Sequence, residues 1–183
     1  GISKNLGVAP HQAEAVTTSQ LVRICLRERG LTRSKIFAII SWTFLLRAAN
    51  EATKLRRALN DELFDDRYTP PRDHALIGLI GDQLVIRLAT RKNKRWGETI
   101  RRSCSCGELL DRSLTSAHCG TEFCPIHVVW PAICQMARPN HRLFADDQPK
   151  TARKWLTENL AAIGTEHADR YTLHSFRRGA AQA

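Results

Sequence analysis

The sequence lacks any apolar run long enough to cross a membrane. Its longest nearly apolar stretch, residues 36–46, is interrupted by Ser41 and Thr43, whereas a membrane span needs about 18 consecutive apolar residues. The first thirty residues show no basic start followed by an apolar stretch, so no secretory signal is visible. We therefore expect no membrane partner and an intracellular protein, nuclear if the host is a eukaryote and cytoplasmic if it is a bacterium.

Several catalytic signatures are also missing from the chain. There is no Gly-rich phosphate loop, no Ser nucleophile elbow and no pair of carboxylates near a histidine. No internal repeat or low-complexity segment is present either. Nucleotide hydrolysis and serine-type hydrolysis are therefore poorly supported. The chain starts at Gly1 rather than at a methionine, as a piece of a longer protein would.

Acidic residues and lysine are scarce in comparison with arginine. The 183 residues hold 28 Lys plus Arg against 18 Asp plus Glu, a net charge of +10, and only seven of the cations are lysines. The planar guanidinium matches two phosphate oxygens at once, which favours nucleic acid as the partner. A basic protein that its charge merely keeps soluble is the plain alternative. With 43% hydrophobic residues, the length suits one globular domain.

The hydrophobic pattern predicts an α+β fold that is mostly α-helical, with a small three-stranded antiparallel sheet. Gly81-Asp82-Gln83 separates the first two predicted strands and is a hairpin signal. An acidic, Pro-rich stretch at residues 61–73 predicts a loop. The predicted strands cover residues 75–80, 84–89 and 98–103, and the predicted helices cover 13–29, 35–47, 125–136, 151–163 and 173–183.

The second predicted helix leaves almost no polar face, so we expect it to be buried, capped by Thr32 or Ser34 and closed by Arg47. A buried guanidinium is costly unless a carboxylate or a phosphate answers its charge. The plain alternative to a phosphate is an ion pair with one of Glu51, Asp61, Asp65 and Asp66.

The last predicted helix carries a His-x-x-Arg pair in its first turn. If Thr172 caps this helix, His174 and Arg177 share one face. Backbone N–H groups and the helix dipole already favour an anion at that end. A phosphate could therefore bind there, although a solvated helix face would show the same spacing.

A basic turn follows the second predicted strand, at residues 90–97. Lys92 and Lys94 have ammonium groups on long stems that could reach a phosphodiester oxygen. Lys92 suits the end of the strand, and Lys94 suits the turn itself. The alternative is a solvated turn that only attracts DNA.

Cysteine and histidine gather within 24 residues between the sheet and the next helix. Without an export signal, such a cluster indicates a metal before a disulfide. A Cys-x-Cys hairpin with a Cys-x-x-His at a helix start could present four ligands to a structural zinc ion in a possible zinc-binding insertion at residues 103–127. Cys119 could replace one ligand, and free buried thiols are the alternative. The predicted ligands are Cys104, Cys106, Cys124 and His127.

Taken in chain order, Leu46-Arg47, the small sheet with its basic turn, and the stretch at residues 174–181 resemble the catalytic domain of tyrosine recombinases, the phage integrase family. The likeness is greater to members carried by eukaryotic mobile elements such as cryptons. It runs from about residue 10 to the end. It implies an integrase-type catalytic domain at 13–183, incomplete at its carboxyl end, preceded at 1–12 by a linker or a remnant of an amino-terminal DNA clamp.

The resemblance also implies roles for single residues. Arg47 and Arg177 would clamp the scissile phosphate, Lys92 would protonate the leaving 5′ oxygen, and His174 would assist proton transfer. The DNA strand would be cut and rejoined through a covalent 3′ phosphotyrosine, with no cofactor for catalysis and any zinc purely structural. We expect double-stranded DNA as the partner and a homo-oligomer assembled on it. The further predicted DNA contacts are Arg91, Lys94, Arg95 and Arg178.

The sequence departs from the family pattern at three points, and one of them is the lysine, which the spacing does not fix between Lys92 and Lys94. The family's acidic residue stands three positions after the first arginine, whereas position 50 is Asn and the acid is Glu51. The family's nucleophilic tyrosine follows the His-x-x-Arg pair by some tens of residues, and this chain ends six residues after it. Tyr68 and Tyr171 do not suit that role by position, so we expect these 183 residues to bind DNA without cleaving it. A non-catalytic, zinc-stabilised DNA-binding module is the alternative function, and a single-strand-cutting topoisomerase is a weaker fit.

Overall fold

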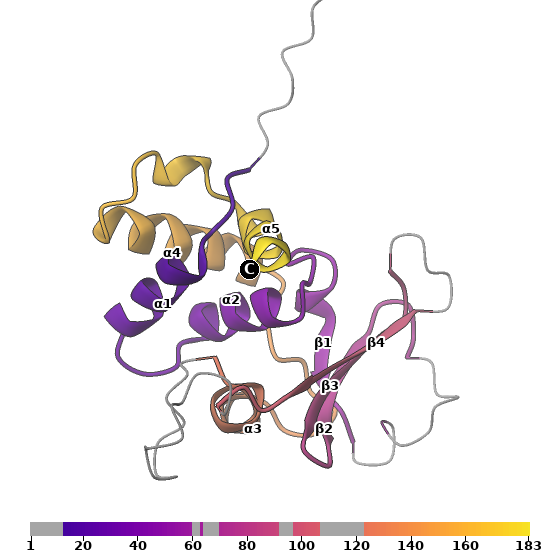
Figure 1. Ribbon diagram of the computed structural model, residues 1–183. Coiled ribbons are helices and arrows are strands. Elements are labelled where there is room, and N and C mark those ends of the chain that lie inside the picture. The colour runs from indigo at the N-terminus through magenta and orange to yellow at the C-terminus, as the bar shows by residue number, and fades with distance from the viewer. Residues whose placement is uncertain (1–12, 60–62, 64–69, 92–96, 107–122) are drawn as a thin grey trace, which may run out of the picture.

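The computed structural model describes residues 13–59, 63, 70–91, 97–106 and 123–183. Helices gather on one side of the molecule and a single sheet lies on the other (Figure 1). The α+β fold class predicted from the sequence is confirmed. No helix in these ranges is both long and apolar enough to span a membrane.

The sheet has four strands in the order β1-β2-β3-β4, which corrects the predicted three. β2 (Ala75–Ile80), β3 (Gln83–Leu88) and β4 (Glu98–Ser103) form the predicted antiparallel part. The hairpin between β2 and β3 closes through Gly81, whose φ of +58° is strained for other residues. β1 (Leu55–Arg57) adds a parallel strand beside β2. Three residues are too few to show the alternation that identifies a strand, which is why the sequence did not reveal β1.

Residues 140–143 cover the outer edge of β1. The backbone N–H of Leu143 donates to the carbonyl of Leu55, and that of Arg57 donates to the carbonyl of His141, at 2.9 and 3.0 Å. The guanidinium of Arg57 then lies over the ring of Trp130, 5.5 Å from its centre. These contacts pair an edge that would otherwise expose free backbone groups, and they fasten the sheet to the helical side.

Helix α2 (Arg33–Thr43) forms the centre of the core, as its uniformly apolar sequence predicted. The Thr32 hydroxyl caps its start by accepting from the backbone N–H of Lys35 at 3.3 Å. Phe37 is fully buried and meets the ring of Phe144 edge-on, with 5.0 Å between the ring centres. Burial of one such side chain contributes about 1.5–3 kcal/mol.

The end of α2 differs from the prediction, because the helix stops at Thr43 and Arg47 lies beyond it. Leu45 adopts a left-handed φ of +51°, which reverses the chain. The backbone N–H of Leu46 returns to the carbonyl of Ser41 at 3.0 Å. The apolar pattern continued past this turn, so periodicity alone could not locate it. Arg47 therefore lies on the turn after the helix.

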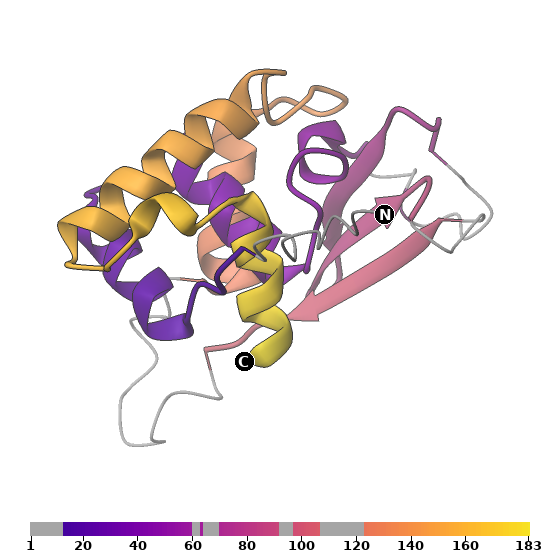
Figure 2. The same ribbon diagram turned by 90° about the horizontal axis from the view of Figure 1, so that it is seen from above.

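Helix α1 (Thr18–Arg27) is shorter than the predicted helix at residues 13–29. Thr17 forms a capping box with Gln20, so the helix begins after it. The residues before Thr17 run extended, and the backbone N–H of Val16 donates to the carbonyl of Ser175 at 3.1 Å. The early chain is thereby attached to α5 (Leu173–Gln182), as Figure 2 shows from above.

The remaining helices agree with their predicted positions. A π-helical turn, η3 (Pro125–Val129), leads into α3 (Trp130–Met136), and α4 (Gln148–Ala162) begins three residues before its predicted start. Short 3-10 turns lie at η1 (Ala52–Lys54) and η4 (Ala168–Arg170). Thr172 caps α5 as predicted.

Gly179 lets α5 lie directly against its neighbours. A Cβ atom at this position would overlap the carbonyl oxygen of Val16 and the ring of Trp42. Any larger residue would push α5 away from α2. The glycine therefore fixes the position of the helix that carries His174 and Arg177.

Candidate functional site

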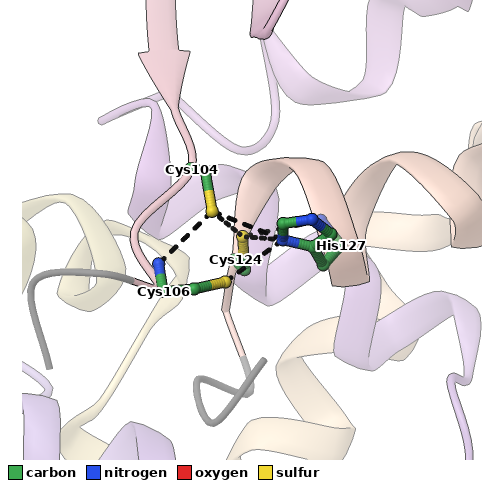
Figure 3. A group of neighbouring side chains, drawn as sticks. All are labelled: Cys104, Cys106, Cys124 and His127. Carbon is green, nitrogen blue, oxygen red and sulfur yellow. Dashed lines mark hydrogen bonds between the residues drawn. The ribbon is translucent and has the colours of Figure 1, made fainter. Parts of the chain in front are cut away.

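Two clusters of chemically active side chains stand out, and the first joins three cysteines and a histidine. Cys104 and Cys106 follow the end of β4, while Cys124 and His127 lie at the start of η3. Figure 3 shows the four side chains pointing toward a common centre. The structure thus brings together all four residues that the sequence predicted as metal ligands.

The donor atoms of the four residues lie close enough together to surround one metal ion. The sulfurs of Cys104, Cys106 and Cys124 lie 3.3, 3.2 and 3.4 Å from Nδ1 of His127. The sulfurs of Cys104 and Cys124 are 3.5 Å apart, and all four donor atoms lie within 4.8 Å of one another. Ligand atoms around one tetrahedral zinc ion stand about 3.5–3.8 Å apart. The cluster could therefore hold a metal ion.

Backbone groups prepare one of these thiols for metal binding. Burial raises the pKa of the Cys124 thiol, but N–H groups of His127, Ser105 and Ile126 outweigh it and bring the pKa down to about 7. The thiolate, which is the form that binds metals, is thus well populated at neutral pH. Burial and the neighbouring Cys124 together raise the pKa of Cys104.

Cys106 has a second possible state. It is disulfide-bonded in the structure, whereas Cys104 and Cys124 are free thiols. A disulfide sulfur is a poor metal ligand because it carries no negative charge. Metal binding by all four residues therefore requires reduced protein.

A shallow cavity of about 300 Å³ lies beside the metal cluster. Trp42 and Phe123 supply its aromatic lining, and Arg102 and Cys104 also border it. The guanidinium of Arg102 donates to the carbonyl of Thr43 at 2.8 Å, which ties β4 to the end of α2. The arginines of the second cluster do not line this cavity.

The second cluster, the arginine cluster, consists of Arg47, Arg91, Arg177, Glu51 and Glu98. Arg47 and Glu51 come from the turn after α2, Arg91 follows β3, Glu98 begins β4, and Arg177 lies on α5. Burial lowers the pKa of Arg177, the charges of Arg91 and Arg47 lower it further, and Glu51 and Glu98 oppose them. Side chains 130 positions apart, such as Arg47 and Arg177, are therefore close enough to repel each other.

Arg91 joins the two carboxylates of this cluster. Its guanidinium pairs with Glu98, lies 3.8 Å from a carboxylate oxygen of Glu51, and donates to the carbonyl of Leu45 at 3.1 Å. Only 13% of its side chain is exposed. The DNA contact that the sequence predicts for Arg91 stays a prediction, and in the structure most of its side chain is buried against these groups.

Glu51, one of the four acids named as alternatives to a phosphate, does not form a side-chain ion pair with Arg47, and the other three, Asp61, Asp65 and Asp66, lie outside the described residues. Glu51 accepts a 2.8 Å hydrogen bond from the backbone N–H of Arg47 instead. Among the described residues, the guanidinium groups of Arg47 and Arg177 have neither a carboxylate within ion-pair distance nor a hydrogen-bond acceptor. Two half-buried cations are thus left without a direct counter-charge in the described part of the chain.

The other predicted site residues have different surroundings. His174 is exposed, one helical turn before Arg177. Arg178 donates to the carbonyl of Ala13 at 2.6 Å, so it has a structural contact that the sequence did not indicate. Lys92, Lys94 and Arg95 lie outside the described residues. Tyr171 is buried in the core, with its hydroxyl 3.3 Å from Nε2 of Gln20.

Glu98 is the member of the arginine cluster that sequence reasoning missed. It lies opposite Leu88 in the β3–β4 pairing, close to the end of β3 where Arg91 follows. An acidic residue at the start of a strand that follows a basic turn was the signal that could have found Glu98, because the strands predicted at residues 84–89 and 98–103 were expected to pair. Comparisons with protein-family models, with curated proteins and with solved structures find no match to this chain.

Proposed function

We propose that this chain binds the backbone of double-stranded DNA through Arg47 and Arg177 and is the catalytic domain, or part of it, of a tyrosine-recombinase-type enzyme. One observation carries the proposal. Two half-buried guanidinium groups from distant parts of the chain lie close enough for the charge of Arg47 to lower the pKa of Arg177, and neither has an ion pair with a carboxylate among the described residues. Like charges do not gather in a partly desolvated site without cost, and a bound phosphate would relieve their repulsion.

The chemistry of phosphodiester transfer suits such a pair. The pentacoordinate phosphorus of the transition state gains negative charge on its equatorial oxygens, and preorganised guanidinium groups stabilise that charge. His174 stands in the first turn of α5, where backbone N–H groups and the helix dipole also favour an anion. In the proposed enzyme His174 assists proton transfer, and a lysine of the turn after Arg91 protonates the leaving oxygen.

The metal cluster has a separate role in this proposal. Three cysteines and one histidine with no open position are typical of a structural zinc site. Bound zinc would cross-link the end of β4 to η3 and would supply no step of the reaction. Its contribution is to hold the residues after β4 against the start of η3.

A binding experiment tests the role of the two arginines. We expect Arg47→Ala and Arg177→Ala each to weaken the affinity for a labelled duplex about tenfold and to reduce the salt slope by about one, as loss of a phosphate contact does. Fluorescence anisotropy at several salt concentrations measures both quantities. Arg153→Ala, which removes an exposed arginine of α4, is the matched control. Losses equal to those of the control would contradict the proposal.

A second experiment separates the enzyme from the binding module. The metal cluster favours the alternative that the domain is a zinc-stabilised DNA-binding module in which the arginines only contribute affinity. We would supply a tyrosine-bearing carboxy-terminal peptide and look on a gel for a covalent adduct with a nicked suicide duplex. Arg47→Ala is expected to reduce the yield of the covalent adduct far more than it reduces the affinity for the duplex. Intact binding without any adduct would favour the module.

A further inference from the structure

We propose that Arg91 is a positioning residue that holds the carboxylates of Glu51 and Glu98 away from Arg47 and Arg177, and so keeps these two guanidinium groups open for an anion. The inference rests on the function proposed above, and it is an alternative to the direct DNA contact that the sequence predicted for Arg91.

The contacts of Arg91 tie three parts of the chain together. Its guanidinium pairs with Glu98 at the start of β4 and lies 3.8 Å from Glu51, in the turn after α2. It also donates to the carbonyl of Leu45, just past the end of α2. With 13% of its side chain exposed, Arg91 has little surface left for DNA. Its contacts serve the inside of the cluster.

The carboxylate of Glu51 would compete with a bound phosphate for the guanidinium groups of Arg47 and Arg177. Its side chain is 5% exposed, and its Oε1 atom is buried without a hydrogen-bond partner. A hydrogen-bond donor or a positive charge near this oxygen is stabilising, because a buried charge without a compensating partner is costly in free energy. The 3.8 Å approach of Arg91 supplies a compensating charge. Without Arg91, the charge of Glu51 would still act on Arg177, whose pKa it raises.

The charge balance of the arginine cluster points in the same direction. Three arginines and two glutamates leave one net positive charge, and removal of Arg91 leaves none. A neutral cluster in which Glu51 and Glu98 can pair with Arg47 and Arg177 offers nothing to a phosphate. Arg91 therefore acts through the carboxylates rather than through the DNA.

A double variant tests this mechanism. We expect Arg91→Met to weaken duplex binding by more than the about tenfold assigned to a single phosphate contact, because it disables both open arginines. Addition of Glu98→Gln to Arg91→Met should restore most of the affinity, since it removes a competing carboxylate. The exposed Arg153→Met variant shows the effect of losing one positive charge alone. Anisotropy measures affinity, and circular dichroism of every variant reports whether it is folded.

The restoration separates positioning from a purely structural role. If Arg91 only held the fold together, Glu98→Gln would not restore the affinity that Arg91→Met loses. Arg91→Lys, which keeps the charge without the planar fork, is a milder variant in case Arg91→Met does not fold. If the planar fork is dispensable, Arg91→Lys should bind DNA better than the second double variant, Arg91→Met/Glu51→Gln. Failure of both Glu98→Gln and Glu51→Gln to restore any binding in Arg91→Met would overturn the inference.

The outcomes also distinguish this inference from the function on which it rests. If Arg47→Ala and Arg177→Ala bind DNA as Arg153→Ala does, the proposed function itself fails. If those two variants lose affinity but Arg91→Met binds as Arg153→Met does, the function stands and the positioning role of Arg91 is overturned. Loss of binding in Arg91→Met with recovery in the double variant supports both.

Discussion

The metal cluster and the arginine cluster are built in opposite ways. The four predicted metal ligands lie within 24 consecutive residues, and one hairpin end and one helix start bring them together. The members of the arginine cluster come from the turn after α2, the segment after β3, the start of β4, and α5. They are spread over residues 47–177 of the sequence. The first cluster depends on local geometry, and the second depends on the whole fold.

This difference teaches where each cluster is vulnerable. Loss of a metal ligand should weaken the link between the end of β4 and the start of η3 and lower stability, while the arginines remain in place. A change that shifts α5 should move Arg177 away from the other members of the arginine cluster, while the four metal ligands keep their arrangement. Stability and DNA affinity are therefore expected to separate when the two regions are altered one at a time.

The largest effect is expected from removal of the metal. Saturation of a site at about a thousand times its dissociation constant contributes roughly 4 kcal/mol, which corresponds to about 10 °C in melting temperature for a domain of this size. We expect Cys124→Ser, or a chelator added to reduced protein, to lower the melting temperature by that amount. Differential scanning calorimetry and elemental analysis check it.

Cys134→Ser provides the matched control for the metal prediction, because this cysteine is a free, half-buried thiol of α3 outside the cluster. Cys134→Ser should keep the melting temperature of the parent protein, and the chelator should still lower it, because all four ligands remain. An unchanged melting curve for Cys124→Ser, together with no metal in the reduced protein, would remove the metal site.

The next effect is expected from Gly179→Ala. The added Cβ would overlap the carbonyl oxygen of Val16 and the ring of Trp42, and overpacking of this kind costs about 3 kcal/mol. We expect the free energy of unfolding in urea to fall by this amount and DNA affinity to fall with it, because α5 carries Arg177. Ala181→Ser, an exposed change on the same helix, is the control. Full DNA affinity in folded Gly179→Ala would show that the arginine cluster does not depend on how closely α5 packs against its neighbours.

The smallest effect is expected from Thr172→Ala at the start of α5. The Thr172 hydroxyl accepts from the backbone N–H of His174 at 3.2 Å, and the Ser175 hydroxyl accepts from the backbone N–H of Thr172 at 2.9 Å. Loss of such a cap costs about 1 kcal/mol. Thr172→Ser keeps the hydroxyl and should retain the stability in urea denaturation. Equal stability of the Ala and Ser variants would contradict the importance of the cap.

The parts of the fold that follow local rules could be predicted from the sequence. The strands at residues 75–80 and 98–103 and the helix caps at Thr32 and Thr172 all rest on patterns a few residues long. The end of α2 could not be predicted, because Leu45 adopts its left-handed φ inside an apolar run that reads as continuous helix. β1 was missed because it gains its strand character from β2 and from residues 140–143.

The two candidate sites repeat this contrast. The metal ligands followed from Cys-x-Cys and Cys-x-x-His spacing, because neighbours in sequence must be neighbours in space. The prediction that Arg47 and Arg177 belong to one site rested on a resemblance rather than on spacing. The ion pairs of Arg91 with Glu51 and Glu98 depend on how a turn, two strand ends and a helix are placed together, and no short pattern encodes that placement.

The hydrogen bonds between the early chain and α5 have a mechanical consequence. Val16 is bonded to Ser175, and Arg178 is bonded to Ala13, so two bonds of 3.1 and 2.6 Å flank Arg177 in the sequence. Tension applied to the backbone at Ala13 is thereby carried to the helix that holds this arginine. A partner that pulled on the start of the chain would act on the distance between Arg177 and Arg47 without touching either one.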